Sequence, residues 1–391
     1  MQSNNIKFSQ RGEALIGQKM FAILDHAKKL ESEGCKVIHL ELGDPILYPP
    51  GRIVNETVMS LLNSDVGYTS SSGLYELRND LSFYLNNKYA NNITINNIII
   101  SVANMLIYQT LDIICNEKDI ISLFTPAFPT YFASSKYIGL DIKEVPLVIE
   151  DGFELTKQYI DKAFSFKPKV IIVNSGNNPT GVVYSEEILS YLLEQASVNN
   201  CWIISDETYS MLSFEKEYFS CLNLKYRKLI VISSFSKVFN LPGYRVGYAV
   251  ADPDVCDKLS LSSSTLYSCL PIFTQKGIKK GIPILDEFSD DRKKHYDSLS
   301  HECVGLINKC KFIRCIQPDS AFYIFIDIGE LNIKDEEFCI ELLKKYYVAV
   351  TPGSSFGYKG FIRISITGEK KDVKVGLSKI IEFSEDIAGR L

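Results

Sequence analysis

Short apolar runs alternate with stretches of helical periodicity between about residues 98 and 250. The runs that have the length of a β-strand are 98–102 (IIISV), 120–124 (IISLF), 170–174 (VIIVN), 201–205 (CWIIS), 229–233 (LIVIS) and 246–250 (VGYAV). They are continuously apolar, which indicates strands that are buried on both faces of a sheet. Helical stretches such as 183–198 lie between them. This part of the chain therefore predicts an α/β fold in which helices sandwich a mostly parallel sheet.

The pattern changes after about residue 275. A charged helical stretch at 286–307 is followed by strand-like runs at 312–315 and 322–327, a helical stretch at 335–346, a strand-like run at 361–366 and a C-terminal helix. Near the start of the chain, an amphipathic stretch at 18–33 ends at Gly34. These elements predict a second, smaller α+β domain. We expect a large domain over 45–275 and a small domain made of 1–44 and 276–391.

Length and charge limit the classes of function. The chain has 391 residues, which is enough for two domains. Its net charge is −5 and it has no strongly basic block, which argues against nucleic acid as a partner. No stretch approaches the ~20 apolar residues that span a bilayer, and the N-terminal residues lack the apolar core of a signal peptide. We therefore expect a cytoplasmic protein with no membrane partner.

Cysteine and histidine spacing gives no support for a metal site. The 10 cysteines include no CxxC pair, which is typical of reduced and mostly buried side chains in a chain of this length. The 4 histidines (His26, His39, His295 and His301) show neither HxxxH nor HExxH spacing. The sequence thus predicts no metal ion and no Ser–His nucleophile, so any chemistry must rest on other side chains.

Polar side chains follow successive strand-like runs at the points where the runs end. SGNNPTG follows 170–174 and contains Asn178, DETYS follows 201–205 and contains Asp206 and Tyr209, and SFSK follows 229–233 and contains Ser234, Ser236 and Lys237. Each residue alone has a structural explanation, such as a turn or a helix cap. Ligands of open α/β sheets bind at the carboxyl ends of the strands, so together these residues predict a ligand site. The strongly hydrated amine of Lys237 is unexpected directly after a buried run.

These motifs resemble those of the fold type I pyridoxal-phosphate (PLP) enzymes, in the class I and II aminotransferase branch. The similar segments are LGDP (42–45), GYTSSSGLYELR (67–78), TPAFPTY (125–131), NNPTG (177–181), SDETYS (205–210), SFSKVFNLPGYRVGY (234–248), PDSAFYIF (318–325), TPGSSFG (351–357) and FIRISI (361–366). They follow the order of the family along nearly the whole chain. The resemblance implies the PLP-transferase fold type I and a PLP-dependent aminotransferase.

The resemblance implies a role for each residue at the strand ends. Lys237 would hold PLP through an imine bond, since lysine is the side chain that supplies an amine, and would then move a proton on the substrate. Asp206 would pair with the pyridine nitrogen and keep it protonated. Asn178 and Tyr209 would hydrogen-bond the phenolic oxygen, and Phe128 would stack on the ring. Lys237, Asp206 and Tyr209 are thus the candidate catalytic residues.

Two segments of the chain would supply hydrogen-bond donors to the phosphate of the cofactor. Ser234, Ser236 and Arg245 would bind it from the loop that contains Lys237. The matching turn after 98–102 reads SVANML and departs from the family, because Met and Leu donate no hydrogen bonds. We expect the backbone amides of Ala103 and Asn104 to bind the phosphate there nevertheless, with help from the side chain of Ser101.

The remaining candidates concern the partner subunit and the substrate. Tyr68 matches a tyrosine that reaches the phosphate of the neighbouring subunit, which implies a homodimer with shared active sites. Arg363 matches the arginine that binds the α-carboxylate of the substrate, with Asn178, Gly43 and Ile16 in the same pocket. We find no second arginine to assign to a distal carboxylate. The sequence thus predicts transfer of an amino group from a neutral, hydrophobic or aromatic amino acid to a 2-oxo acid.

Two alternatives remain open. The same cofactor serves other reactions at the α-carbon, such as β-elimination by a C–S lyase or the reaction of a cyclase, and local motifs do not separate these from transamination. A PLP-binding regulator without catalysis is the second alternative. Such proteins usually carry a DNA-binding module, and the roughly 40 residues before LGDP contain no basic helix-turn-helix pattern.

Overall fold

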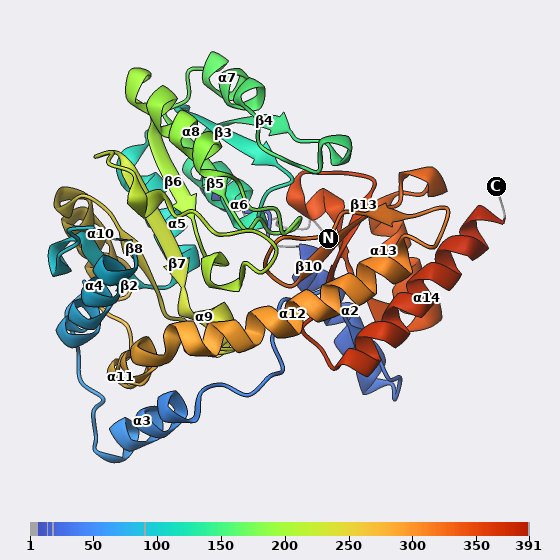
Figure 1. Ribbon diagram of the computed structural model, residues 1–391, viewed down its shortest axis with the longest axis horizontal. Helices are drawn as coiled ribbons and strands as arrows, with labels where there is room; N and C mark the ends of the chain where they lie inside the picture. The colour runs from blue at the N-terminus through green and yellow to red at the C-terminus, as the bar shows by residue number, and fades with distance from the viewer. Residues whose placement is uncertain (1–6, 14, 18, 90, 390–391) are drawn as a thin grey trace.

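The core of the molecule is a seven-stranded, mostly parallel sheet (Figure 1). The computed structural model describes residues 7–13, 15–17, 19–89 and 91–389. The strands in chain order are β2 (Ile98–Ser101), β3 (Ile120–Thr125), β4 (Asp141–Pro146), β5 (Val170–Asn174), β6 (Trp202–Asp206), β7 (Leu229–Ser234) and β8 (Gly247–Val250). Their order across the sheet is β2-β8-β7-β6-β5-β3-β4, and β8 is antiparallel to both of its neighbours.

Helices cover both faces of this sheet. Successive residues of a strand point to opposite faces, so Ile171 and Val173 pack on one layer while Val170 and Ile172 pack on the other. The first layer contains α4 (Tyr75–Tyr89), α7 (Lys157–Ser165), α8 (Glu186–Val198) and α11 (Ile272–Gly281). The second contains α5 (Ala103–Ile114), α6 (Pro129–Ile138) and α10 (Pro253–Leu266). Burial on both sides explains the continuously apolar strands and confirms the predicted fold class.

A second, antiparallel sheet of four strands has the order β12-β13-β10-β9. These strands are β9 (Arg314–Cys315), β10 (Tyr323–Asp327), β12 (Thr351–Pro352) and β13 (Phe361–Ser365), and β1 (Ile38–His39) pairs separately with β11 (Val348–Ala349). The helices around them are α2 (Lys19–Ser32), α12 (Leu285–Ile307), α13 (Asp335–Tyr346) and α14 (Lys370–Ala388). In Figure 1, α12 runs from the first sheet to the second. The division at residues 44/45 and 275/276 stays a prediction.

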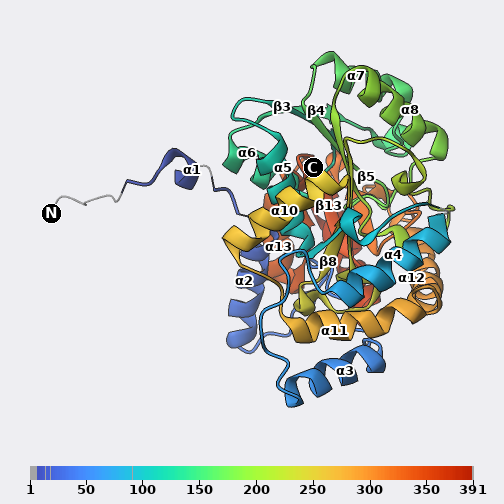
Figure 2. The same ribbon diagram turned by 90° about the vertical axis from the view of Figure 1, so that its left-hand side faces the viewer.

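The described residues also form further helices and 3-10 turns. They are α1 (Gln10–Glu13), α3 (Gly51–Leu62) and the single turn α9 (Phe235–Val238), with 3-10 turns at Ile95–Asn97, Ile149–Asp151, Ser210–Leu212, Cys221–Asn223, Pro242–Tyr244, Ile282–Ile284, Gly329–Leu331 and Gly353–Phe356. Figure 2 shows α3 beside α11, and α1 projecting from one side of the molecule. Gly277 of α11 allows α3 to pack this closely, since a Cβ atom at position 277 would lie 2.2 Å from Oγ1 of Thr57.

The predicted strands and helices match the structure to within a few residues at their ends. The strand β4 was not predicted, because charged residues interrupt its sequence, DIKEVP, at an edge of the sheet. The two-residue strands β1, β11 and β12 were not predicted either. The antiparallel direction of β8 was not predicted either, since an apolar run is the same in both directions. Among the described helices, none combines the length and the hydropathy that crossing a bilayer would require.

Candidate active site

A cavity of about 540 Å³ lies where β5, β6 and β7 end, facing β10 and β13 of the second sheet. Its lining includes most of the predicted site residues: Gly43, Ala103, Asn104, Phe128, Asn178, Asp206, Tyr209, Ser234, Ser236, Lys237, Arg245 and Arg363. It also includes residues that sequence reasoning did not single out, among them Asp44, Tyr131, Thr208 and Tyr323. The strand ends thus bring together side chains that are distant in the sequence.

Lys237 lies on α9, directly after β7. Ser234 ends the strand and begins the helix, since its hydroxyl accepts a hydrogen bond from the amide of Ser236. The Nζ atom of Lys237 donates to the carbonyl of Gly43 at 2.7 Å. Burial, together with the positive charges of Arg363 and Arg245, lowers the pKa of Lys237 to about 8. An amine with such a pKa is a competent nucleophile near neutral pH.

Asp206 is buried at the end of β6 and faces the cavity. Its Oδ2 atom accepts a hydrogen bond from the hydroxyl of Tyr131 at 2.7 Å. Its Oδ1 atom accepts from the hydroxyl of Thr208 at 2.7 Å and from the amide of Thr208 at 3.1 Å. Burial raises the pKa of Asp206, and these hydrogen bonds oppose the rise. The carboxyl group is therefore held in one orientation inside a desolvated site.

Arg363 is almost completely buried on β13, and its guanidinium is held from several sides. Its Nη1 atom donates to Oδ1 of Asn178 at 3.0 Å, and its Nη2 atom donates to the main-chain carbonyl of Glu41. The guanidinium carbon lies 4.3 Å from the ring centre of Tyr323. Such a planar cation, held on its face and at its ends, is suited to bidentate binding of a carboxylate.

The hydroxyl of Tyr323 lies close to two residues of the predicted site, Tyr209 and Gly43. Its hydroxyl lies 2.9 Å from the hydroxyl of Tyr209, and a Cβ atom on Gly43 would lie 2.0 Å from it. Gly43 is therefore required for this close approach. The sequence could have singled out Tyr323 only by its place in PDSAFYIF, since its contacts come from packing of β10 against the large sheet.

The N-terminus of α5 also lines the cavity, through Val102, Ala103 and Asn104. Val102 precedes the helix without a side-chain cap, which leaves the first amides, at Ala103 and Asn104, available to a ligand. Ser234, Ser236 and Arg245 line the same cavity. Backbone amides, hydroxyls and a guanidinium are the donors that a phosphate requires. Together with a buried carboxylate and a lysine of lowered pKa, these groups fit PLP.

The side chains of Arg245 and Ser101, both predicted to bind the phosphate, are engaged by other groups of the protein. Arg245 has a left-handed backbone conformation, and its Nη1 atom donates to the carbonyl of Pro242 at 2.8 Å. The hydroxyl of Ser101 is engaged by the hydroxyl of Tyr267, and Ser101 does not line the cavity. A phosphate donor role for the Ser101 side chain is therefore not supported by this geometry.

Two predicted residues lie outside the cavity of the single chain. Tyr68 is 91% exposed, and Ile16 is 48% exposed. Ile16 does not line the cavity of the single chain, and its place in the substrate pocket stays a prediction. The sequence also predicts that the apolar segment 14–17 (ALIG), which contains Ile16, lines the substrate pocket, and its first residue, Ala14, lies outside the described residues. The role predicted for Tyr68 requires a second subunit.

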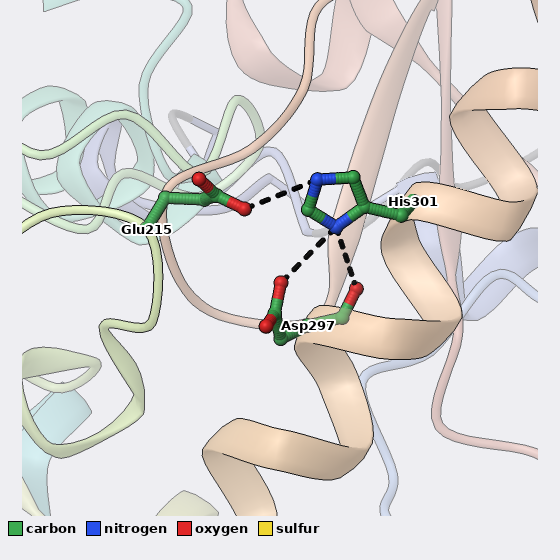
Figure 3. A group of neighbouring side chains, drawn as sticks. All are labelled: Glu215, Asp297 and His301. Carbon is green, nitrogen blue, oxygen red and sulfur yellow. Dashed lines mark hydrogen bonds and ion pairs between the residues drawn. The ribbon is translucent and has the colours of Figure 1, made fainter.

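His301 of α12 lies between two carboxylates (Figure 3). Its Nε2 atom is 3.2 Å from Oε1 of Glu215, and its Nδ1 atom is 3.1 Å from Oδ1 of Asp297. Each carboxylate thus contacts a different nitrogen atom of the imidazole. A metal ion bound to either nitrogen would displace the carboxylate that contacts it. The group is therefore a polar contact between α12 and the loop at Glu215.

Comparison with known proteins agrees with this site. The family model of aminotransferase class I and II matches residues 36–380. The chain is 33% identical over 383 residues to the (5-formylfuran-3-yl)methyl phosphate transaminase of Methanocaldococcus jannaschii. The alignment covers 94% of this chain and 98% of that protein. It is also 28% identical over 360 residues to the aspartate aminotransferase of Thermotoga maritima. That alignment covers 91% of this chain and 94% of the relative.

The fold agrees as well. The crystal structure of the Thermotoga maritima aspartate aminotransferase superposes with a TM-score of 0.90 at 27% identity, covering 96% of this chain and 99% of that one. The match includes the mainly parallel sheet between its helices and extends through the second sheet. The chain therefore belongs to the class I and II aminotransferases and is an aminotransferase that depends on pyridoxal phosphate.

Proposed function

We propose that Lys237 is the residue that binds PLP covalently and that the amino donor is a neutral, hydrophobic or aromatic amino acid. The proposal for Lys237 is supported by one observation: its amine, which has a lowered pKa, lies in the same cavity as the buried carboxyl of Asp206. When bound, PLP supplies an aldehyde carbon that takes up the amino group and a ring that withdraws electrons.

The side chains have separate tasks in this proposal. Asp206, oriented by Tyr131 and Thr208, holds the proton on the ring nitrogen. Asn178 and Tyr209 donate hydrogen bonds to the phenolic oxygen. The amine of Lys237 would take the proton from the α-carbon of the amino acid and would deliver a proton to the carbon of the cofactor that comes from its aldehyde.

Binding groups lie at the two ends of the cavity. Ser234, Ser236 and Arg245, with the amides of Ala103 and Asn104, hold the phosphate. Phe128 packs on the ring. At the other end, Arg363 binds the α-carboxylate of the substrate, next to Asn178 and Gly43, and this fixes which bond of the α-carbon faces Lys237.

The charge of the cavity supports a neutral donor. The lysines and arginines among its described lining residues are Lys237, Arg245 and Arg363, and the proposal assigns a task to each. A distal carboxylate would enter a partly desolvated site without a partner cation. Aspartate is the second candidate, because several similar proteins are aspartate aminotransferases.

A homodimer is part of the proposal. Apolar side chains on α3 and the segment after it are exposed in the single chain: Val58, Met59, Leu61, Leu62 and Val66. Tyr68 follows directly, and burial of this surface against a second copy would bring its hydroxyl to the phosphate end of the partner's cavity.

Steady-state kinetics with a panel of donors test the substrate proposal. We expect kcat/KM for phenylalanine, leucine or methionine, with a 2-oxo acid as acceptor, to exceed that for aspartate at least tenfold. A clear preference for aspartate would contradict the neutral donor and point to a cation supplied by the partner subunit. Arg52, at the start of α3, is the first residue to substitute in that case.

A further inference from the structure

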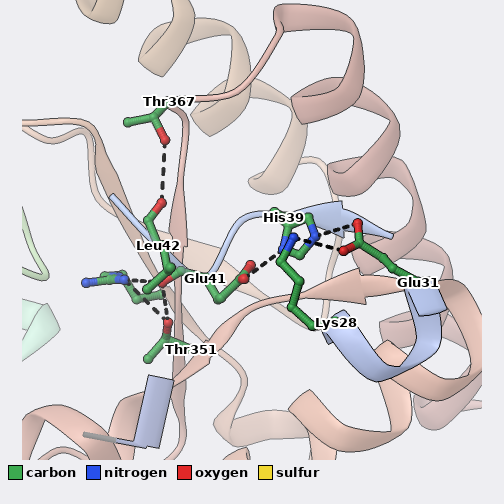
Figure 4. A network of polar contacts seen from close by, with 8 residues as sticks. Lys28, Glu31, His39, Glu41, Leu42, Thr351 and Thr367 are labelled. Carbon is green, nitrogen blue, oxygen red and sulfur yellow. Dashed lines mark hydrogen bonds and ion pairs between the residues drawn. The ribbon is translucent and has the colours of Figure 1, made fainter. Parts of the chain in front are cut away.

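A chain of charged side chains leads from the surface to the substrate end of the cavity (Figure 4). On α2, Lys28 pairs with Glu31 at 3.0 Å. His39, at the end of β1, lies between two acids: its Nε2 atom is 3.1 Å from Oε1 of Glu31, and its Nδ1 atom is 2.8 Å from Oε1 of Glu41. Hydrogen bonding to Glu41 raises the pKa of His39. The imidazole thus keeps its positive charge to a higher pH than a free histidine.

Glu41 is the buried end of this chain. Its side chain is 0% exposed, and among the described residues its Oε2 atom has no hydrogen-bond partner. Removing a carboxylate from water is costly unless a cation or several donors compensate. Among the residues that the structure describes, His39 is the side-chain partner of this carboxylate.

Arg363 is the second cation beside Glu41. The Nη2 atom of Arg363 and the hydroxyl of Thr351 both donate to the main-chain carbonyl of Glu41, the latter at 2.8 Å. Arg363 therefore contacts the backbone of Glu41, while the carboxylate of Glu41 turns to His39. The Nε atom of Arg363 is buried and has no partner within the described part of the chain, so the guanidinium keeps unused capacity for an anion.

We propose that His39 is a positioning residue that reserves Arg363 for the substrate, because it holds the buried carboxylate of Glu41 away from the guanidinium. Without His39, the guanidinium of Arg363, which already contacts the backbone of Glu41, is left as a partner for this carboxylate, and Glu41 then competes with the α-carboxylate of the substrate. The inference rests on the role of Arg363 given under the proposed function. It concerns affinity for the substrate and leaves the proton transfers at Lys237 unchanged.

The test compares His39→Gln with the double variant His39→Gln/Glu41→Gln. We expect His39→Gln to raise KM for the amino donor at least tenfold while kcat changes less than threefold. The double variant removes the competing charge, so its KM should return to within threefold of the wild-type value. Glu31→Gln is the matched control, since it removes the outer acid of His39 and leaves the Glu41 contact; its KM should stay within twofold.

A binding measurement on the PLP-loaded proteins gives a readout besides turnover. Calorimetry with 3-phenylpropionate and with succinate, which carry the carboxylate without the amine, should show the same weakening in His39→Gln and the same recovery in the double variant. A purely structural role for His39 predicts a lower melting temperature and no recovery on adding Glu41→Gln. An unchanged KM in folded His39→Gln, or no recovery in the double variant, would overturn the inference.

Arg363→Lys separates this inference from the function on which it rests. If Arg363→Lys raises KM and His39→Gln does not, the inference fails and the role of Arg363 stands. If Arg363→Lys leaves KM unchanged, or neither carboxylate binds the wild-type protein, the role of Arg363 fails and the inference with it. Should His39→Gln not fold, His39→Asn, which is smaller and keeps a donor, takes its place with the same expected outcomes.

Discussion

The hydroxyl of Tyr131 donates a hydrogen bond to Asp206, with 2.7 Å between the phenolic oxygen and Oδ2. The two residues lie 75 positions apart in the chain, and meet because α6 packs on the face of the sheet near the end of β6. Thr208 holds the other carboxylate oxygen. Both contacts favour the ionised form, which is the form that can keep a ring nitrogen protonated.

Replacing Asp206 with Ala should reduce turnover by roughly a thousandfold or more at saturating PLP, since loss of a desolvated ion pair is worth several kcal/mol. Steady-state kinetics on the PLP-saturated variant measure this. Glu207→Gln is the matched control, because Glu207 is an adjacent buried acid that does not line the cavity. Near-normal turnover of Asp206→Ala would exclude Asp206 as the partner of the ring nitrogen.

The pKa of Lys237 predicts how fast the apoprotein captures PLP at different pH values. Only the unprotonated amine attacks the aldehyde, so the rate should rise with pH and level off above about 8, the pKa to which burial lowers this lysine. Stopped-flow absorbance measures the rate, with an N-acetylated free lysine as the reference. A midpoint near 10.5, the ordinary lysine value, would show that the amine is not desolvated in this way.

The sequence predicts the acids, amides and lysine of the site well and their supporting contacts poorly. Asn178, Asp206 and Lys237 could be found because each directly follows an apolar run, and strand ends meet at one edge of a parallel sheet. Tyr131 and Tyr323 carry no such signal. Their roles come from packing of α6 and β10, and a buried tyrosine in an apolar run is most often simply part of the core.

Assembly is tested by mixing two inactive proteins. If Tyr68 completes the site of the partner, Lys237→Ala and Tyr68→Ala subunits should form mixed dimers in which one site carries both lesions and the other carries neither. About half of the wild-type activity per mixed dimer should then return, as expected for one intact site of two. No recovery in mixed dimers demonstrated by mass spectrometry would mean that Tyr68 does not act across the interface.

Glu207 should make the stability of the protein depend on pH. Burial raises the pKa of Glu207 from 4.5 to about 7, although Ser220, Ser205 and the amide of Cys221 donate to it. The folded protein therefore retains a proton that the unfolded chain releases, and the free energy of unfolding falls as pH rises from about 4.5 to about 7.

The variant Glu207→Gln lacks this titration. Its stability relative to the wild type should increase between pH 5 and pH 8, by on the order of 3 kcal/mol. Urea unfolding of both proteins at the two pH values measures the difference. A difference that does not change with pH would show that Glu207 is ionised in the folded protein throughout this range.

Covalent attachment of the cofactor to Lys237 is the central claim, and reduction with borohydride tests it most directly. The purified protein, loaded with PLP, is reduced, digested and mapped by mass spectrometry. The account predicts a pyridoxyl group on Lys237, in the peptide that contains SFSKVFNLPGYR, and no label in Lys237→Ala. A label on any other lysine, with Lys237 unmodified, would contradict the assignment of the site.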